Sequence, residues 1–146
     1  MDWIFREIDM RSGLILLMVL ALSAATACEG SDSAAEPDSI TVDQLAAGMQ
    51  KAQITPCDSN GTSTRKKHGV VPGAVLLSSY SEYAISELPA DKSRTLAFYC
   101  SSAKCSAAPK AATKAIAAGY SDVRWLKVGI KGWKAAGQKT QVVPGG

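Results

Sequence analysis

The sequence is short of the residues that metal sites and nucleic-acid surfaces need. It contains one histidine, His68, and no Cys-x-x-Cys pair, so the ligand spacing of a zinc or copper site is missing. Aromatic residues make up 6% of the chain, and no basic stripe with interleaved aromatics is present. The formal net charge is +3. We therefore expect no metal, no cofactor and no nucleic acid, but a mildly basic surface that attracts small anions.

Long apolar runs are also scarce. The run Leu14–Leu22 is shorter than the roughly twenty residues of a membrane span. Arg6 and Arg11 precede it, and small residues follow it up to Cys28, which is the pattern of a secretory signal. A cysteine at this place resembles the bacterial lipoprotein signal. It predicts a signal peptide over residues 1–27, a lipid on Cys28, and an exported protein anchored on the periplasmic side of the bacterial cell envelope. Ordinary cleavage before a free cysteine is the alternative.

The remaining chain has the length of one domain. Residues 28–38 are polar and lack large apolar side chains, so we expect a flexible tether there. A folded domain is expected over residues 39–141, followed by a short tail over 142–146. Acidic residues are unusual before the apolar run of a leader, and they would fall outside it if translation began at Met10.

Cys100 stands between a predicted strand and a predicted helix. The apolar run Thr95–Tyr99 is typical of a buried strand, and the alanine-rich segment 107–118 is typical of a helix that ends at Gly119. In parallel sheets such turns lie at the carboxyl ends of the strands, where the free amides of a helix start favour negative charge. We therefore expect the pKa of this thiol to lie below the usual value of about 8.5. An inert core cysteine is the alternative.

Alternating strand and helix signals predict an α/β fold, with a parallel sheet of about five strands and helices on both faces. Thr41, followed three residues later by Gln44, predicts a capping box. Pro56 lacks an N–H group, which places its strand at an edge or near a strand end. Residues 59–62 are interpreted as a turn and the basic run 65–67 as a solvated loop. The expected strands begin near 40 and cover 53–58, 73–77, 95–99 and 123–128, and the expected helices cover about 42–49, 80–87, 107–118 and 130–136.

Four segments then occur in a recognisable order and spacing. They are Val-Pro-Gly-Ala-Val-Leu-Leu at 71–77, Phe-Tyr-Cys at 98–100, Ala-Gly-Tyr-Ser-Asp-Val at 118–123, and Gly-Ile-Lys-Gly-Trp-Lys-Ala-Ala-Gly at 129–137. From about Ser39 to about Gln141 the chain resembles single-domain rhodanese-like sulfurtransferases. Trp133, in the last of these segments, is interpreted as a core anchor rather than as a ligand contact.

The resemblance implies both an activity and a site. Cys100 would carry a persulfide and pass the sulfane sulfur to a thiol or another nucleophile. The expected partner is a small sulfur-containing anion or a low-molecular-weight thiol. The substrate would be bound by the inward-pointing backbone amides of the loop, which are those of Ser101, Ser102, Ala103, Lys104, Cys105 and Ser106.

The loop departs from the family pattern at two places. Ala103 stands where a glycine is usual, and alanine tolerates positive φ poorly, so the loop should differ in shape. Cys105 stands where an arginine or threonine is usual, so the chain lacks a guanidinium that could bind an anionic sulfur donor. Lys104 and Lys110 could partly replace its positive charge. A disulfide between Cys100 and Cys105 is also open. His68 lies near the family's usual histidine position and is interpreted as a solvated loop residue.

Other functions remain open. Cys105 could resolve an oxidised Cys100, which would make the protein a thiol–disulfide or redox-sensing protein. The domain could also be a catalytically inactive binding module. Phosphatases of the same fold hold phosphate with an arginine six residues after the nucleophile, and here that position is Ser106. Cys57 is interpreted as a packed core cysteine, with a place near the loop as the alternative.

Overall fold

The computed structural model describes residues 35–143, so the predicted signal peptide and Cys28 lie outside the described part. The described residues form a parallel five-stranded sheet with the strand order β1-β5-β4-β2-β3. The strands are β1 (Asp38–Ser39), β2 (Ile54–Asp58), β3 (Val75–Leu76), β4 (Thr95–Tyr99) and β5 (Val123–Leu126), and the helices are α1 (Val42–Gln50), α2 (Thr62–His68), the 3₁₀ turn η1 (Ile85–Glu87), α3 (Ala107–Ala117) and α4 (Gly129–Ala135). This confirms the predicted fold class. No helix in this part of the chain is long and apolar enough to span a membrane.

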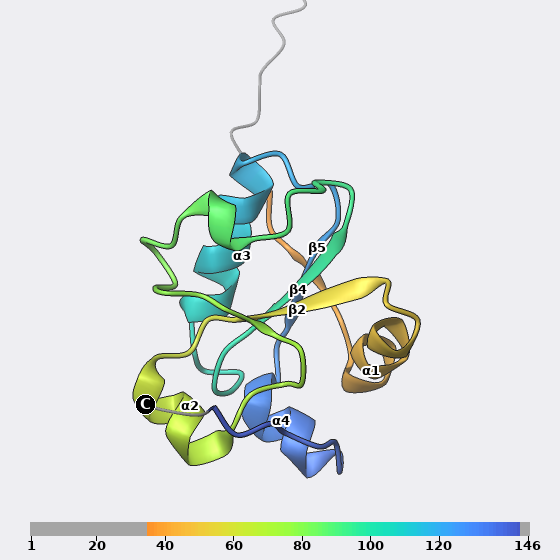
Figure 1. Ribbon diagram of the computed structural model, residues 1–146, viewed down its shortest axis with the longest axis vertical. Helices are drawn as coiled ribbons and strands as arrows, with labels where there is room; N and C mark the ends of the chain where they lie inside the picture. Colours follow the sequence, from red (N-terminus) through yellow and green to blue (C-terminus); the bar gives the residue numbers. More distant parts are fainter. Residues whose placement is uncertain (1–34, 144–146) are drawn as a thin grey trace, which may run out of the picture. The chain divides into compact units, whose positions relative to one another are not determined.

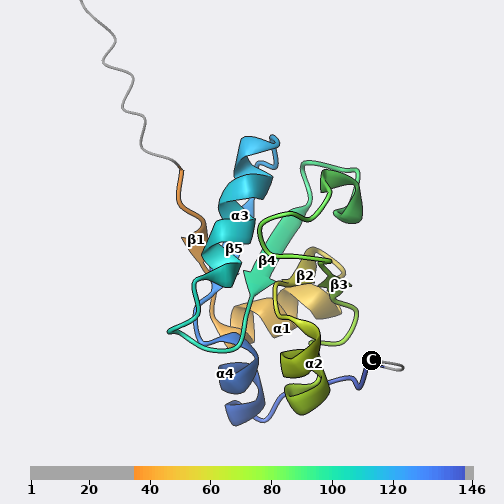
Figure 2. The ribbon, with the colours of Figure 1, turned by 90° about the vertical axis from the view of Figure 1, so that its left-hand side faces the viewer.

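The central strand β4 divides the core into two layers. Leu96, Phe98 and Cys100 are buried in the layer that contains α3, whereas Ala97 and Tyr99 are buried in the layer that contains α1 and α4. This alternation follows from the pleat, which turns successive side chains to opposite faces. Figures 1 and 2 show α3 on one side of the sheet and α1 on the other. Four fully buried alanines let α3 pack closely, as the sequence predicted: Ala108, Ala111, Ala112 and Ala115.

Local signals set the ends of several helices where we predicted them. The Gln44 amide donates to Thr41 Oγ1 at 3.2 Å, and the Thr41 amide donates to Gln44 Oε1 at 3.0 Å, which confirms the capping box. Gly119 and Gly137 follow α3 and α4 with φ of 94° and 78°. These positive values favour glycine, so both helices end there.

Pro56 lies in β2, which is an inner strand of the sheet. Its neighbour β3 pairs only with Cys57 and Asp58, whereas β4 pairs with all five residues of β2. Pro56 therefore lies where β2 has a neighbour on one side only, and its missing N–H costs no ladder bond on the open side. The prediction of an edge or a strand end was wrong for β2 as a whole, because Pro56 is the middle residue of an inner strand, but β2 has an open side at Pro56.

The basic run that was predicted as a solvated loop lies within helix α2. The Arg65 guanidinium donates to the backbone oxygens of Asp58 at 3.0 Å and Leu77 at 2.8 Å. Its Nε also lies 3.4 Å from the buried carboxylate of Asp58. These contacts of Arg65 hold the helix against the carboxyl end of β2. Lys66, Lys67 and His68 form its last residues before Gly69.

The segments before β4 are shorter than predicted. The strand expected over 73–77 is reduced to the two residues of β3, and the helix expected over 80–87 is reduced to η1. The Glu87 carboxylate accepts bonds from the amides of Ser78 and Ala84, at 2.8 and 2.9 Å. These side-chain bonds to backbone amides hold the segment as a turn and compete with helical bonding. Strand β5 likewise ends at Leu126, because residues 127–128 turn the chain into α4.

Candidate active site

Cys100 is the first residue of the loop between β4 and α3, as the sequence predicted. The side chain is 1% exposed and belongs to the α3 layer of the core. Its thiol donates to the backbone oxygen of Cys105 at 3.2 Å and lies 3.8 Å from that of Ser102. The turn is closed by the Cys105 amide, which donates to the same Ser102 oxygen at 3.0 Å. The loop therefore folds back over the sulfur of Cys100.

Helix α4 holds the loop from outside. The amide of Ile130 donates to the Cys100 oxygen at 2.8 Å, and the amide of Lys131 donates to the Ser101 oxygen at 3.2 Å. Gly129 makes this approach possible, since a Cβ at this position would lie 2.5 Å from the Cys100 oxygen. In both views α4 lies beside α2 at the end of the sheet that carries the loop (Figures 1 and 2). Because α4 binds the carbonyl groups of Cys100 and Ser101, the amides of the loop remain available to Cys100 and Cys105.

Those amides are directed at the two loop thiols. The amides of Ala108 and Ser102 act to lower the pKa of Cys100 and so favour its thiolate. The amides of Ala107 and Ser101, together with the Ser101 hydroxyl, do the same for Cys105. Sequence reasoning named the loop amides but missed those of Ala107 and Ala108. The signal was present, because these are the first two residues of the predicted helix.

The order of the two pKa values is the reverse of the prediction. Burial, and to a smaller extent the interaction with the Cys105 thiol, raise the pKa of Cys100 to about 12. Burial also acts to raise the pKa of Cys105, but the bonds from the Cys100 thiol and the Ala107 and Ser101 amides outweigh it and lower that pKa. We expected the Cys100 pKa below its usual value. The amides are present, but Cys100 is the more deeply buried thiol of the pair, so Cys105 is the more acidic of the two.

This order predicts which thiol reacts first with an alkylating agent. At neutral pH, iodoacetamide should modify Cys105 faster than Cys100, because alkylation follows thiolate content and exposure. Its rate should rise with pH and level off below the pH of an ordinary cysteine, whereas Cys100 stays protonated. Trypsin separates the two residues into peptides 95–104 and 105–110, so peptide masses over time measure both rates. Faster labelling of Cys100 would contradict this order.

The other predicted loop residues form the rim. Ala103, Lys104 and Ser106 are exposed, and Ser101 and Ser102 are partly exposed. Within residues 35–143, Ala52 is the only non-glycine residue with positive φ, so Ala103 makes the turn without left-handed backbone. Lys110 lies elsewhere, with its ammonium group 5.9 Å from the centre of the Tyr80 ring. Lys104 is thus the predicted point charge that belongs to the loop.

A buried polar network borders the loop, and sequence reasoning missed most of it. The carboxylate of Asp58 accepts from the Tyr99 hydroxyl at 2.7 Å and from the Asn60 amide at 2.6 Å. The Tyr99 oxygen in turn accepts from the Val71 amide at 3.0 Å. The Ser59 amide donates to the Tyr99 oxygen of the backbone at 2.9 Å, which places Ser59 beside Cys100. The network therefore ties β2 and β4 together directly below the loop.

Cys57 does not take part in the loop. It is fully buried in β2, and burial together with the charge of Asp58 raises its pKa to about 12. This confirms the prediction of a packed core cysteine. Cys57, Cys100 and Cys105 are all free thiols, so the suggested disulfide is not formed in this structure.

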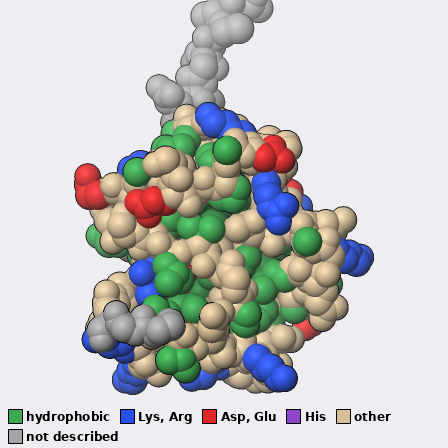
Figure 3. All heavy atoms as spheres, viewed as in Figure 1, with side chains coloured by type: hydrophobic (Ala, Val, Ile, Leu, Met, Phe, Trp, Pro, Cys, Tyr) green, Lys and Arg blue, Asp and Glu red, His purple; other side chains and the backbone are tan. Residues whose placement is uncertain are grey.

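Lysines surround the loop end of the sheet. The pKa of His68, in α2, is lowered by desolvation and by the charges of Lys131, Lys134 and Lys67. We call these three lysines the basic cluster. In Figure 3, Lys and Arg side chains gather along the lower edge, over α2 and α4. The amide of Lys131 is bound to the loop itself, so the cluster lies next to the site and attracts anions towards it.

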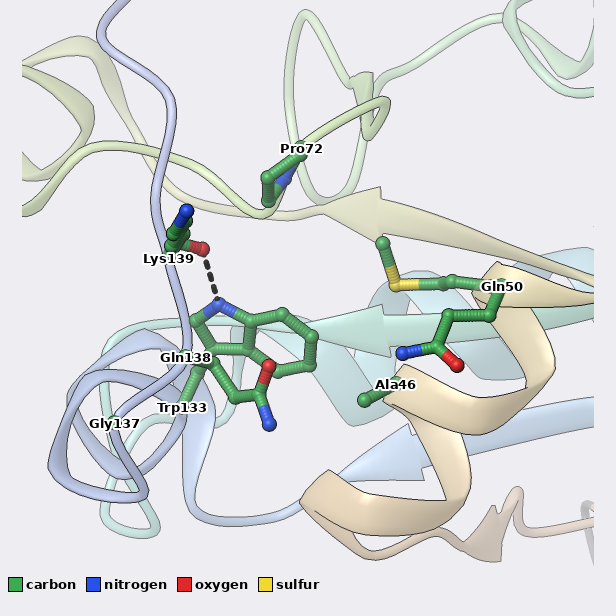
Figure 4. Close-up of a pocket in the computed structure, with 8 residues that line it drawn as sticks. Ala46, Gln50, Pro72, Trp133, Gly137, Gln138 and Lys139 are labelled. Atoms are coloured by element: carbon green, nitrogen blue, oxygen red, sulfur yellow. Dashed lines mark hydrogen bonds between the residues drawn. The ribbon is translucent and has the colours of Figure 1, made fainter.

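A separate pocket of about 470 Å³ lies between α1 and α4. Figure 4 shows Trp133 facing Ala46 and Gln50 across it. The Trp133 indole is 3% exposed and donates to the Lys139 oxygen at 2.8 Å, which confirms its role in the core. The lining holds no nucleophile or carboxylate, and it belongs to the face of the sheet opposite to Cys100. Among residues 35–143 no group of three or more candidate metal ligands comes together.

Comparison with known proteins bears on both the fold and the site. A family model for the rhodanese-like domain matches residues 41–136, whereas no curated protein matches the sequence. Among solved structures, a rhodanese-related protein from Thermoplasma volcanium is 17% identical with a TM-score of 0.60, covering 73% of this chain and 99% of its own. A 3-mercaptopyruvate sulfotransferase from Escherichia coli is 20% identical with a TM-score of 0.54, at 74% and 53% coverage. A Rhodopseudomonas palustris protein of unknown function, described as a possible tyrosine phosphatase, is 19% identical with a TM-score of 0.57, at 72% and 85% coverage.

Proposed function

The chain belongs to the rhodanese-like domain family, and from this we propose that it is a sulfurtransferase that carries sulfane sulfur as a persulfide on Cys100. The observation that carries the proposal is the orientation of the loop. Its carbonyl groups at Cys100 and Ser101 are bound by α4, and the amides of Ser102 and Ala108 act to lower the pKa of the Cys100 thiol. Amides that favour the negative charge of a thiolate also stabilise the anion of a persulfide.

Sulfur loading begins when the Cys100 thiol loses its proton to solvent. Burial raises the pKa of this thiol to about 12, so its thiolate is the minor form at neutral pH. The Cys100 thiolate attacks the outer sulfur of a donor such as thiosulfate, and sulfite leaves with the electron pair of the broken S–S bond. The product is a persulfide whose terminal sulfur carries the negative charge. An acceptor thiolate or cyanide then attacks that terminal sulfur, and Cys100 leaves as a thiolate.

The surroundings of the loop favour anionic sulfur donors. The basic cluster of Lys67, Lys131 and Lys134 lies beside it, and Lys104 stands on its rim. Phosphate hydrolysis is less favoured, because Ser106 provides no fixed guanidinium where phosphatases of this fold use one.

The test is a tryptic mass map of the reduced protein after brief exposure to thiosulfate. We expect a gain of one sulfur atom on peptide 95–104, which contains Cys100. The peptide containing Cys57 serves as the internal control and should be unchanged. Undiminished transfer of sulfur by a Cys100→Ser variant would overturn the proposal, as would a gain of sulfur only on the Cys57 peptide.

A further inference from the structure

The loop contains a second cysteine that sulfur transfer through Cys100 alone does not require. Cys105 is partly exposed, whereas Cys100 is buried beneath the loop. The turn from Ser102 to Cys105 brings the backbone oxygen of Cys105 to 3.2 Å from the Cys100 sulfur. The Cys105 side chain also packs on the core cluster that contains Cys100. The two cysteines are thus neighbours within one turn.

We propose that Cys105 is a resolving thiol, which attacks the Cys100 persulfide, closes a Cys100–Cys105 disulfide and releases hydrosulfide. The inference rests on the proposed persulfide. It adds a second outlet for the sulfur, used when no acceptor thiol is present. The domain would then deliver either sulfane sulfur to an acceptor or sulfide to solution.

The step balances without an external oxidant. The Cys105 sulfur attacks the Cys100 sulfur, a new S–S bond forms, and the bond between the Cys100 sulfur and the terminal sulfur breaks. The terminal sulfur leaves with the electron pair, and it takes the proton of the Cys105 thiol to become hydrosulfide. The sulfane sulfur is reduced to sulfide while two thiols are oxidised to a disulfide. A thiol reductant outside the protein returns the loop to its starting state by ordinary exchange.

The environment of Cys105 suits an attacking thiol. The neighbouring Cys100 thiol and the amides of Ala107 and Ser101 lower its pKa, and a lower pKa makes more of the attacking thiolate available. Cys57 is the other cysteine of the described domain. It is fully buried in β2, and its thiol lies 3.8 Å from the backbone oxygen of Thr55. Cys57 therefore serves as the matched control.

The experiment is a single turnover without an acceptor. The protein is loaded with thiosulfate, freed of the donor under anaerobic conditions, and incubated with no thiol. Free sulfide is measured with time, and a non-reduced tryptic map follows peptides 95–104 and 105–110. In the wild type we expect loss of the persulfide, one sulfide released for each persulfide lost, and a disulfide between the two peptides. Rates are normalised to the persulfide present at the start, so the efficiency of loading cancels.

Variants separate the inference from the proposed function. Cys105→Ser and Cys105→Thr should keep the persulfide and form no disulfide, whereas Cys57→Ala should behave as the wild type. Sulfide release by both Cys105 variants at the wild-type rate would overturn the resolving role but leave the persulfide on Cys100 established. Failure of the wild type to gain sulfur on peptide 95–104, with thiosulfate and with polysulfide as donors, would overturn the proposed function and this inference together.

Discussion

A Gly129→Ala variant should transfer sulfur at least about 100-fold more slowly than the wild type, the loss typical of removing one donor that stabilises an anion in an active site. A Cβ at this position would lie 2.5 Å from the oxygen of Cys100 and 2.7 Å from the carbonyl carbon of Ser101 and the nitrogen of Ser102. All three are backbone atoms, so no side chain can rotate away. The loop would move off α4, and its amides would no longer converge on the Cys100 sulfur.

Gly129→Ala also introduces backbone strain, in addition to the clash of the new Cβ with the Cys100 loop. Gly129 has φ of 63°, which alanine adopts only at a cost of about 1 kcal/mol. Gly137 provides the control, since it has φ of 78° at the other end of α4 and no atom within 4 Å of a Cβ. Gly137→Ala should lose a similar amount of free energy of unfolding through backbone strain, and it should keep its activity. Measurement of kcat with thiosulfate and of the free energy of unfolding distinguishes the two variants. Equal activities would show that α4 does not set the geometry of the loop.

The parts of the fold that the sequence predicted have local causes. The capping box of Thr41, the glycines after α3 and α4, and the alternating pattern of β4 each involve residues close together in the chain. Helix α2 could not be predicted in this way. Its anchor Arg65 is bound to the backbone oxygens of Asp58, at the end of β2, and of Leu77, directly after β3. A basic run is by itself typical of a solvated surface.

The same distinction applies to the site. Cys100 could be located because a strand, a loop and a helix follow one another in the sequence. The order of the thiol pKa values could not, because it depends on how deeply each sulfur is buried and on contacts between them. The role of Gly129 was also beyond local reasoning. The sequence shows a glycine at position 129, but the Cys100 loop that this glycine contacts lies almost thirty residues earlier in the chain.

The second large effect concerns the network below the loop. Asp58→Ala should lower the free energy of unfolding by about 3 kcal/mol or more, the usual loss when one partner of a buried ion pair is removed. The Asp58 carboxylate is fully buried, and the Arg65 side chain facing it is 13% exposed. The variant also removes the acceptor of the Tyr99 hydroxyl and the Asn60 amide. Urea or guanidinium unfolding measures the change.

The cause of that loss can be tested with two further variants. Asp122 forms an ion pair with Arg124 in which the two side chains are 32% and 37% exposed, so Asp122→Ala should cost less than about 1 kcal/mol. If the unpaired charge of Arg65 causes most of the loss, the double variant Asp58→Ala/Arg65→Met should be more stable than the sum of its single changes predicts. Strict additivity would mean that Asp58 acts through Tyr99 and Asn60 instead. The Asp58 network lies at the carboxyl ends of β2 and β4. If Asp58→Ala also loses sulfur transfer, the Cys100 loop depends on the support of this network.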